Sequence, residues 1–211
     1  MNSVGRVRVR RDNGWKIERY PQIAVGSTGG APDPRAALVQ SALQIALSDG
    51  LDTVTVDAVA ARAGVAPETV LRTFGDQDGL TLALLDFVLA RTLDAERDIP
   101  TPDSGPRQLG DMVAAELEGL RRQAPVVELI FMFYFTRRDE LYRGRIREAL
   151  SNYRQSFESA LDGVDLRRGV DATVMSSIVL SFLQGAAVQI IRDPENFVPS
   201  AAIAEMRAML Q

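Results

Sequence analysis

The chain lacks two residue types on which much protein chemistry depends. Its 211 residues include no cysteine and no histidine. Disulfide scaffolds, zinc sites built on these residues, cysteine nucleophiles and histidine-based catalytic triads are therefore excluded. Pairs of carboxylates such as Asp162 and Asp165 are more typical of surface and helix-cap positions than of acid–base or metal sites. We therefore expect no enzyme, no metal and no cofactor.

Aromatic residues are also scarce, at 6%, whereas apolar residues make up 46% of the chain. This length and composition can bury the core of one large domain, or of a small domain attached to a larger one. No apolar segment follows the basic residues near the N-terminus, so we expect no signal peptide and a cytoplasmic protein. Residues 172–191 carry no charge, but their serine, threonine and glutamine content favours a helix of a soluble protein over a membrane span. We expect this helix to be buried on nearly all sides, with one face against a second subunit.

The formal net charge of −4 is unevenly distributed. Residues 1–35 carry seven basic and three acidic side chains, so the rest of the chain is acidic. A basic arm on an acidic body indicates a polyanionic partner, although a solvated polar tail explains the charges equally well.

The first residues favour a β-hairpin. Val7 and Val9 alternate with arginines, and Asp12, Asn13 and Gly14 supply a tight turn. Such a hairpin is marginal alone, so it must pack, pair with another chain or be disordered. Residues 26–34 then form a linker rich in glycine and proline, so residues 1–33 are interpreted as a basic arm, with a hairpin and a linker.

Residues 34–80 contain the start and stop signals of short helices. Thr55 is placed to cap a helix over 56–63, Gly64 makes the turn that follows, and Pro67 suits the first turn of the next helix. Val70, Leu71 and Phe74 are predicted to face inward, and Gly75 and Asp76 to end this helix and cap another. The pattern predicts a helix-turn-helix held by flanking helices.

After a break at IPTPDSGP, every remaining pattern is helical. We predict an all-α fold, in which an N-terminal three-helix helix-turn-helix domain precedes a C-terminal helical bundle over residues 81–211. The bundle helices are expected over residues 107–123, 125–137, 139–161, 170–192 and 200–210.

The segment RAALVQSALQIALSDGLDTVTVDAVAARAGVAPETVLRTF, followed by GDQDGLTLALL, resembles the DNA-binding domain of the TetR (tetracycline repressor) family of bacterial transcription regulators. The resemblance implies a DNA-binding domain over residues 34–80 and a ligand-binding and dimerisation domain over residues 81–211. The expected function is a ligand-responsive repressor of transcription. It would bind a palindromic double-stranded DNA operator as a homodimer formed through residues 170–192 and 200–210, and respond to an apolar small-molecule effector.

The second helix of the motif would lie in the major groove, with its early residues nearest the base edges. By position these are Ala66, Pro67, Glu68, Thr69, Arg72 and Thr73. The resemblance assigns phosphate contacts to Thr55, to the outer face of the recognition helix, and to the start of the fourth helix, where Gln77 stands. Arg6, Arg8, Arg10 and Arg11 of the arm are further candidates for DNA contacts.

The segment departs from the family beside Phe74. Members usually carry tyrosine or histidine there, whereas this chain has Leu71, Arg72 and Thr73, and a common lysine is replaced by Gln77. Residues 35–80 hold three basic and six acidic side chains. Because phosphate neutralisation supplies most non-specific affinity, DNA binding should be weak or assisted. Either the basic arm compensates, or the chain is a helical small-molecule sensor whose degenerate helix-turn-helix binds DNA weakly or not at all.

Aromatic residues recur at helical spacing in the second half of the chain. Ordinary core explains most of them, but a ligand pocket between helices is a normal feature of bundles. The resemblance favours the pocket, for which the candidate residues are Met112, Phe131, Tyr134, Phe135, Tyr153, Phe157, Phe182 and Gln184.

Overall fold

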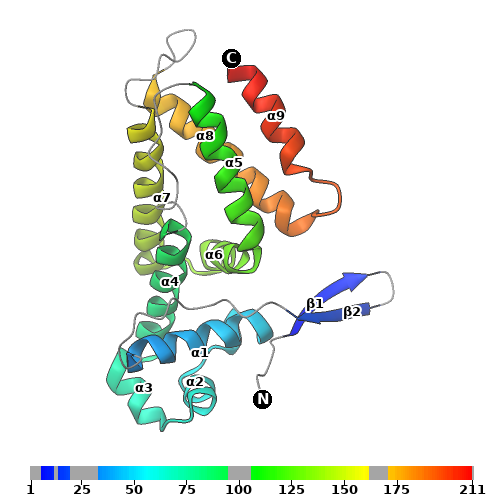
Figure 1. The fold of residues 1–211 in the computed structure, drawn as a ribbon. Coiled ribbons are helices and arrows are strands. Elements are labelled where there is room, and N and C mark those ends of the chain that lie inside the picture. The colour runs from blue at the N-terminus through cyan, green and yellow to red at the C-terminus, as the bar shows by residue number, and fades with distance from the viewer. Residues whose placement is uncertain (1–5, 12–13, 20–32, 95–105, 162–170, 211) are drawn as a thin grey trace. The chain divides into compact units, whose positions relative to one another are not determined.

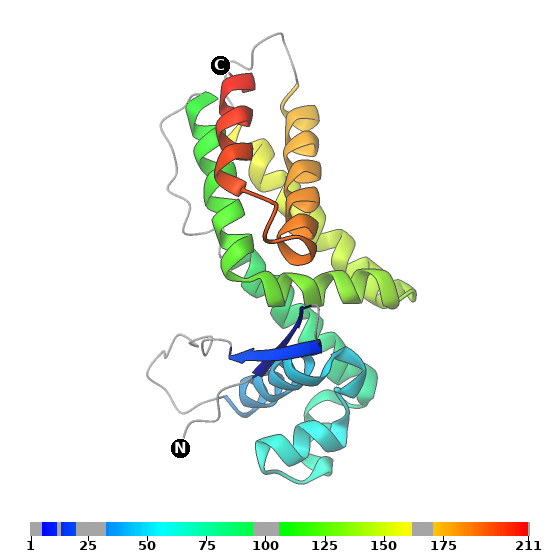
Figure 2. The same ribbon diagram turned by 90° about the vertical axis from the view of Figure 1, so that its right-hand side faces the viewer.

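A computed structural model of the chain describes residues 6–11, 14–19, 33–94, 106–161 and 171–210. Within these residues the fold is helical apart from one pair of strands (Figure 1, Figure 2), which confirms the all-α class. The chain divides into two compact units, Met1–Phe87 and Val88–Gln211. The division falls inside a helix, later than the boundary expected at residue 80.

The first unit is a three-helix arrangement with an additional strand pair. Its elements are β1 (Arg6–Arg11), β2 (Gly14–Arg19), α1 (Pro34–Asp49), the short 3-10 helix η1 (Leu51–Thr53), α2 (Val56–Ala63), α3 (Pro67–Phe74) and the first part of α4 (Gln77–Asp94). Helix α2 packs against both α1 and α3. Fully buried aliphatic side chains such as Ala42, Val59, Val70 and Leu80 form its core.

The predicted helix ends of this unit are confirmed. The Thr55 hydroxyl accepts a hydrogen bond from the N–H of Ala58, which caps α2. Gly64 ends α2 in the left-handed conformation, with φ of 71°. The Asp76 carboxylate accepts a hydrogen bond from the N–H of Gly79 at 2.7 Å and caps α4. A Cβ at Gly79 would collide with a backbone carbonyl oxygen, so the chain needs glycine there.

Strands β1 and β2 pair antiparallel, in the register Arg6↔Arg19 and Arg10↔Trp15. This pairing matches the predicted hairpin. The turn residues Asp12 and Asn13, and the linker up to residue 32, lie outside the described residues.

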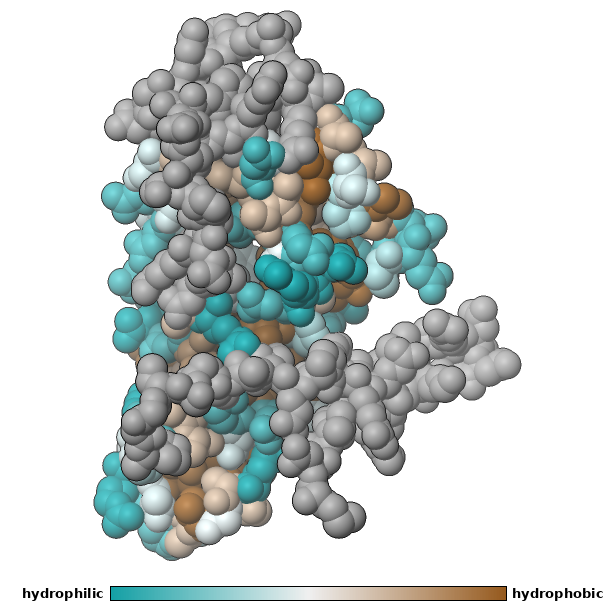
Figure 3. Space-filling view, in the orientation of Figure 1, coloured by the Kyte–Doolittle hydropathy of each residue, from teal (hydrophilic) through white to brown (hydrophobic). Residues whose placement is uncertain are grey.

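The second unit is a helical bundle. It contains the rest of α4 together with α5 (Pro106–Arg122), α6 (Ala124–Thr136), α7 (Glu140–Ala160), α8 (Ala172–Arg192) and α9 (Pro199–Leu210). Helix α8 packs against α5 and α7, and α9 lies along α5 (Figure 1, Figure 2). A hydrophobic core cluster joins α5, α7 and α8 through residues such as Val113, Leu117, Phe157 and Leu183. On the face drawn in Figure 3, apolar residues are interspersed with polar ones.

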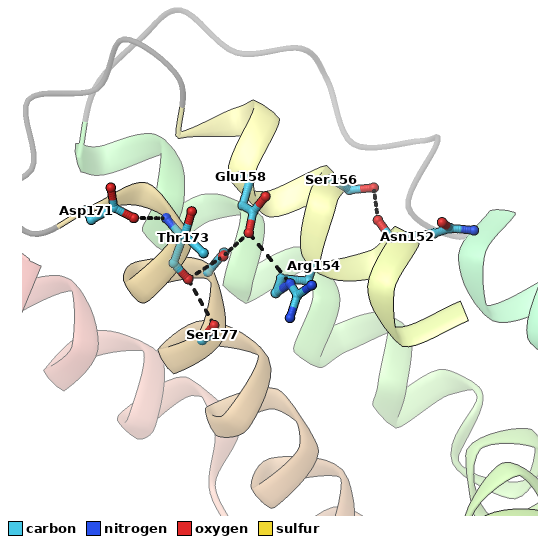
Figure 4. A network of polar contacts seen from close by, with 8 residues as sticks. Asn152, Arg154, Ser156, Glu158, Asp171, Thr173 and Ser177 are labelled. Atoms are coloured by element: carbon cyan, nitrogen blue, oxygen red, sulfur yellow. Dashed lines mark hydrogen bonds and ion pairs between the residues drawn. The ribbon is translucent and has the colours of Figure 1, made fainter. Parts of the chain in front are cut away.

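Polar contacts fix the start of α8 against the end of α7 (Figure 4). The Glu158 carboxylate accepts a hydrogen bond from the Ser176 hydroxyl at 3.4 Å and pairs with the Arg154 guanidinium at 3.6 Å. Asp171 caps α8 by accepting a hydrogen bond from the N–H of Thr173 at 2.8 Å.

Helix α8 is long and apolar enough to cross a membrane, with mean hydropathy 1.8 over its most apolar window. Only 33% of that window is buried, so the expectation of burial on nearly all sides is wrong for a single chain. The reason is that α5, α6 and α7 leave part of its circumference uncovered. Val174, Ile178 and Val188 are consequently 52%, 55% and 44% exposed.

Candidate nucleic-acid interface and ligand cavity

Helices α2 and α3 meet at a turn that only a small set of residues permits. Gly64 takes a positive φ, and the N–H of Val65 donates to the carbonyl oxygen of Ala60 at 3.0 Å. An L side chain is strained in that conformation, whereas glycine is not. The two helices therefore form the predicted helix-turn-helix.

Helix α3 buries one side and exposes the other. Val70 is fully buried, whereas Ala66, Glu68 and Arg72 are exposed. Pro67, Thr69 and Thr73 are half-buried. Leu71, predicted to face inward, is 41% exposed. Consecutive helical residues are rotated by about 100°, so the residue after a buried Val70 leaves the side that meets α2.

Two threonines shape the outward face of α3. The Arg72 guanidinium donates to the Thr69 hydroxyl oxygen at 3.4 Å, and the Thr73 hydroxyl donates to the Thr69 carbonyl oxygen at 2.7 Å. The only hydroxyl hydrogen of Thr73 is therefore used in a hydrogen bond within α3. Arg72 is left as the exposed basic group of α3.

Gln77 connects the start of α4 with the start of α2. Its amide oxygen accepts a hydrogen bond from the N–H of Val56 at 3.0 Å, and its amide nitrogen donates to the carbonyl oxygen of Val54 at 2.8 Å. The nitrogen also donates to the Thr81 hydroxyl at 3.1 Å. The side chain at the family's lysine position is therefore engaged inside the first unit, a role that the sequence did not indicate.

The other two basic residues of the segment also have partners in the protein. Arg35 lies 4.8 Å from the centre of the Phe74 ring and donates to the carbonyl oxygen of Thr73 at 3.3 Å. Arg62 pairs with Asp49 at 3.9 Å. Such contacts weaken any role for these two cations at a phosphate. The candidates Arg6, Arg8, Arg10 and Arg11 all belong to β1, where Arg6, Arg8 and Arg10 occupy alternate positions and Arg11 follows Arg10.

The second unit contains a cavity of about 260 Å³. It is bounded by residues of α4, α5, α6, α7 and α8. Its lining residues are Leu89, Thr92, Leu120, Val127, Ile130, Phe131, Tyr134, Phe135, Ile146, Ala149, Leu150, Tyr153, Leu180, Leu183, Gln184 and Ala187.

Five of the predicted pocket residues come together in this lining: Phe131, Tyr134, Phe135, Tyr153 and Gln184. The other three do not line it. Met112 and Phe157 are buried in the core cluster of α5, α7 and α8, and Phe182 packs against that cluster. Helical spacing alone does not distinguish a residue that faces this core from one that faces the cavity.

An aromatic group from α6 occupies one side of the lining. The rings of Phe131 and Phe135 are stacked with centres 6.2 Å apart, and Tyr134 meets Phe135 edge-on at 5.2 Å. Phe135 is 67% exposed and Tyr134 is 54% exposed. These rings therefore lie where the cavity reaches the surface of the unit.

A buried carboxyl lies behind the lining. The Tyr153 hydroxyl donates to the Glu116 carboxylate at 2.8 Å, and Glu116 is only 8% exposed. Burial raises the pKa of the Glu116 carboxyl above its usual value, and the hydrogen bond from Tyr153 opposes that shift. The pair places a polar group beside a wall that is mostly apolar.

Comparison with known proteins supports the assignment of a helix-turn-helix to α2 and α3. Residues 38–84 match the sequence model of the bacterial regulatory proteins of the tetR family. No curated protein matches the chain in sequence.

Solved structures share the fold over most of the chain. A transcriptional regulator from Rhodococcus sp. Rha1 has a TM-score of 0.68 at 18% identity, covering 84% of this chain and 96% of its own. A second regulator from Rhodococcus sp. RHA1 has 26% identity and a TM-score of 0.61, covering 84% of this chain and 94% of its own. The fatty acid degradation regulator FadR from Bacillus halodurans has a TM-score of 0.66 at 16% identity, covering 86% of this chain and 96% of its own.

The family match covers α2 and α3, the helices whose packing forms the helix-turn-helix. The fold of the remaining helices is that of solved transcriptional regulators. Residues 38–84 are therefore similar to the tetR family of bacterial regulatory proteins, and the chain shares its fold with solved transcriptional regulators over most of its length.

Proposed function

We propose that the chain is a cytoplasmic repressor that binds a palindromic operator as a homodimer and releases it when an apolar effector binds. The observation that carries the DNA-binding part is the outward face of α3, where Arg72 is exposed and bonded to Thr69. A guanidinium and a hydroxyl are groups that read base edges in the major groove. No catalytic role is part of the proposal.

The proposed DNA contacts divide into two groups. The base-edge group is on α3 and its start: Ala66, Pro67, Glu68, Thr69, Arg72 and Thr73. The phosphate group consists of the helix N-termini at Thr55 and Gln77, where backbone N–H groups and the helix dipole favour an anion. Because Gln77 is engaged with Val54 and Val56, we assign the start of α4 a backbone contact rather than a side-chain contact.

The exposed side of α8 supports dimerisation. Val174, Ile178, Ser181, Gly185 and Val188 follow one another at intervals of three and four residues, and all five are exposed. This spacing forms one uncharged stripe along a helix and is typical of a helix–helix interface. We propose that this stripe, with α9, meets a second copy of the chain. Two recognition helices about one DNA turn apart would then face a palindromic operator.

The N-terminal strand pair is proposed to compensate for the acidic helix-turn-helix. Residues directly opposite each other in an antiparallel pair share one face of the ribbon. The register therefore puts the positions of Arg6, Arg8, Arg10 and Arg19 on the same face, without an acidic residue among them. Paired strands of this kind enter DNA grooves in other proteins.

Deleting residues 1–30 tests whether the β1–β2 strand pair contributes to DNA binding. We expect the affinity for operator DNA to fall and the salt dependence to become shallower, because each phosphate contact contributes about 0.9 to the logarithmic salt slope. Unchanged affinity and slope would show that the arm takes no part.

The cavity is the proposed effector site. A ligand that favours one of two arrangements of the dimer shifts the equilibrium by its differential affinity, typically worth about 1–3 kcal/mol. The similar structure of a fatty acid degradation regulator makes an acyl chain one candidate for the apolar part of the effector.

A gel-shift experiment with DNA from upstream of the gene tests the DNA-binding part of the proposal. Specific binding that is lost in Arg72→Ala and in Thr69→Ala is the expected result. Gln44→Ala, at an exposed position of α1, serves as the control.

The second candidate function is a small-molecule sensor that no longer reads DNA. It is favoured by the six acidic residues of positions 35–80 and by the partners of Arg35 and Arg62 inside the protein. Absence of binding even at low salt, with an intact fold, would establish this alternative over the repressor.

A further inference from the structure

The wall of the cavity restricts the chemistry of the effector, provided that the cavity is the effector site proposed above. None of the described residues that line it is charged. Its polar members are Thr92, Tyr134, Tyr153 and Gln184. An ion moved from water to such a site loses hydration that the wall does not replace, at a cost of several kcal/mol or more.

The two less exposed polar residues of the wall, Thr92 and Tyr153, already use their hydroxyl hydrogens in hydrogen bonds within the protein. The Thr92 hydroxyl donates to the carbonyl oxygen of Val88 at 2.9 Å, and the Tyr153 hydroxyl donates to the Glu116 carboxylate at 2.8 Å. A hydroxyl has one hydrogen and two acceptor sites. Towards a ligand, each of these oxygens therefore acts as an acceptor.

Tyr134 and Gln184 do not change this conclusion for the shielded part of the wall. Both residues are exposed, and so belong to the side of the cavity that solvent reaches. Water competes there for any hydrogen bond to a ligand. The selective contacts are consequently those at Thr92 and Tyr153.

We propose that the cavity recognises an apolar molecule whose polar end is an uncharged hydrogen-bond donor, such as a hydroxyl group, and that it discriminates against carboxylates. A hydroxyl donates to Thr92 or Tyr153, whereas a carboxylate brings only acceptors and a charge.

The size of the cavity sets the size of the probe. At the ~30 Å³ that one water occupies in the liquid, the cavity of about 260 Å³ corresponds to roughly nine water-sized groups. Octan-1-ol matches this size. Octanoate carries the disfavoured charge on a chain of the same length, and 1-methoxyheptane has the same number of heavy atoms as octan-1-ol but no donor.

Isothermal titration calorimetry of the full chain at about pH 8, where octanoate is ionised, compares the three probes. We expect octan-1-ol to bind about fivefold more tightly than 1-methoxyheptane, which corresponds to one net hydrogen bond. Octanoate should bind at least about tenfold more weakly than octan-1-ol, since a carboxylate beside Thr92 and Tyr153 would lose hydration and meet no hydrogen-bond donor there.

Thr92→Val and Tyr153→Phe should each reduce the advantage of octan-1-ol over the ether. Thr92→Val replaces the hydroxyl with a methyl group of similar shape and leaves Glu116 with its partner, so it remains informative if Tyr153→Phe perturbs folding. Thr136→Val is the matched control, because Thr136 also donates to its own helix but does not line the cavity.

Three results would overturn the proposal, and they have different consequences for the proposed effector site. Octanoate binding as tightly as octan-1-ol would refute the discrimination against anions while leaving an effector site in place. Equal binding of the alcohol and the ether would refute the donor requirement. Absence of binding by all three probes would also remove the effector part of the proposed function, whereas the DNA part is decided separately by the gel shift.

Discussion

Replacing Gln77 with alanine should destabilise the first unit more than an exposed substitution normally does. The side chain makes three hydrogen bonds, with Val54, Val56 and Thr81, at 2.8, 3.0 and 3.1 Å. A typical intramolecular hydrogen bond contributes about 0.5–1.5 kcal/mol net. In the variant, the N–H of Val56 can donate to water instead, and the Thr81 hydroxyl keeps its hydrogen bond to the backbone carbonyl oxygen of residue 77. A loss of about 1.5–3 kcal/mol is therefore expected for the three bonds together.

Urea denaturation of the full chain measures this loss, with Gln44→Ala as the control. Gln44 is exposed on α1, and the same substitution there should change the free energy of unfolding by no more than about 0.5 kcal/mol. Hydrogen exchange localises the effect, since the amide of Val56 should exchange faster only in Gln77→Ala. Equal stability of the two variants, with unchanged exchange at Val56, would refute the bridging role of Gln77.

Gln77→Lys separates this structural role from the phosphate role. Lysine keeps a donor for Val54 but loses the acceptor for Val56, so about 1 kcal/mol of stability should be lost. The added cation should steepen the logarithmic salt dependence of DNA binding by about 0.9 per site. A steeper slope combined with lower stability is the expected signature, and an unchanged slope would show that this position does not approach a phosphate.

Three further predictions concern other parts of the chain. Gly64→Ala should cost about 1 kcal/mol in urea denaturation, because φ is 71° there, and a cost near zero would contradict the turn. Ile178→Glu should shift the chain towards the monomer in sedimentation experiments, whereas Leu141→Glu, at an equally exposed apolar position of α7, should not. Burial raises the pKa of Glu116 above 4.5, so the folded chain holds this proton more tightly and stability falls as pH rises from 4.5 through the raised pKa. Glu116→Gln should remove this fall, and equal pH dependence of the two proteins would contradict it.

The helix ends of the first unit were predictable because their chemistry is local. Thr55, Gly64 and Asp76 act on backbone groups within a few residues of their own position. Side-chain preferences at such positions follow from which N–H groups a helix leaves unpaired. The same reasoning places Pro67 at the start of α3.

The role of Gln77 could not be predicted in this way. Its partners Val54 and Val56 lie more than twenty residues earlier in the chain, and only the tertiary fold brings the start of α4 to the start of α2. The exposure of Leu71 was missed for a related reason, because an apolar residue in a short helix does not reveal which neighbour covers it. Residue type alone would have placed both Val70 and Leu71 inside.

The sequence predicted a pocket between helices of the bundle, but only some of the residues that line it. Aromatic and methionine residues at helical spacing indicated Phe131 and Tyr153, which line the cavity, and equally Met112 and Phe157, which fill the core. Leu89 and Thr92 were missed because the apolar residues of α4 do not indicate in sequence which of them face a cavity and which face the core. Which apolar residues face an opening depends on how helices cross, and side-chain spacing carries no information about that.

The most direct test of the regulator is a fluorescence anisotropy measurement of binding to DNA from upstream of the gene, against a scrambled duplex of the same length and at the same salt concentration. Specific recognition predicts a preference of about 10³-fold or more for the upstream sequence, and Arg72→Ala should largely abolish this preference. Equal affinity for both duplexes, or no binding at low salt, would contradict the account of α3 as a recognition helix.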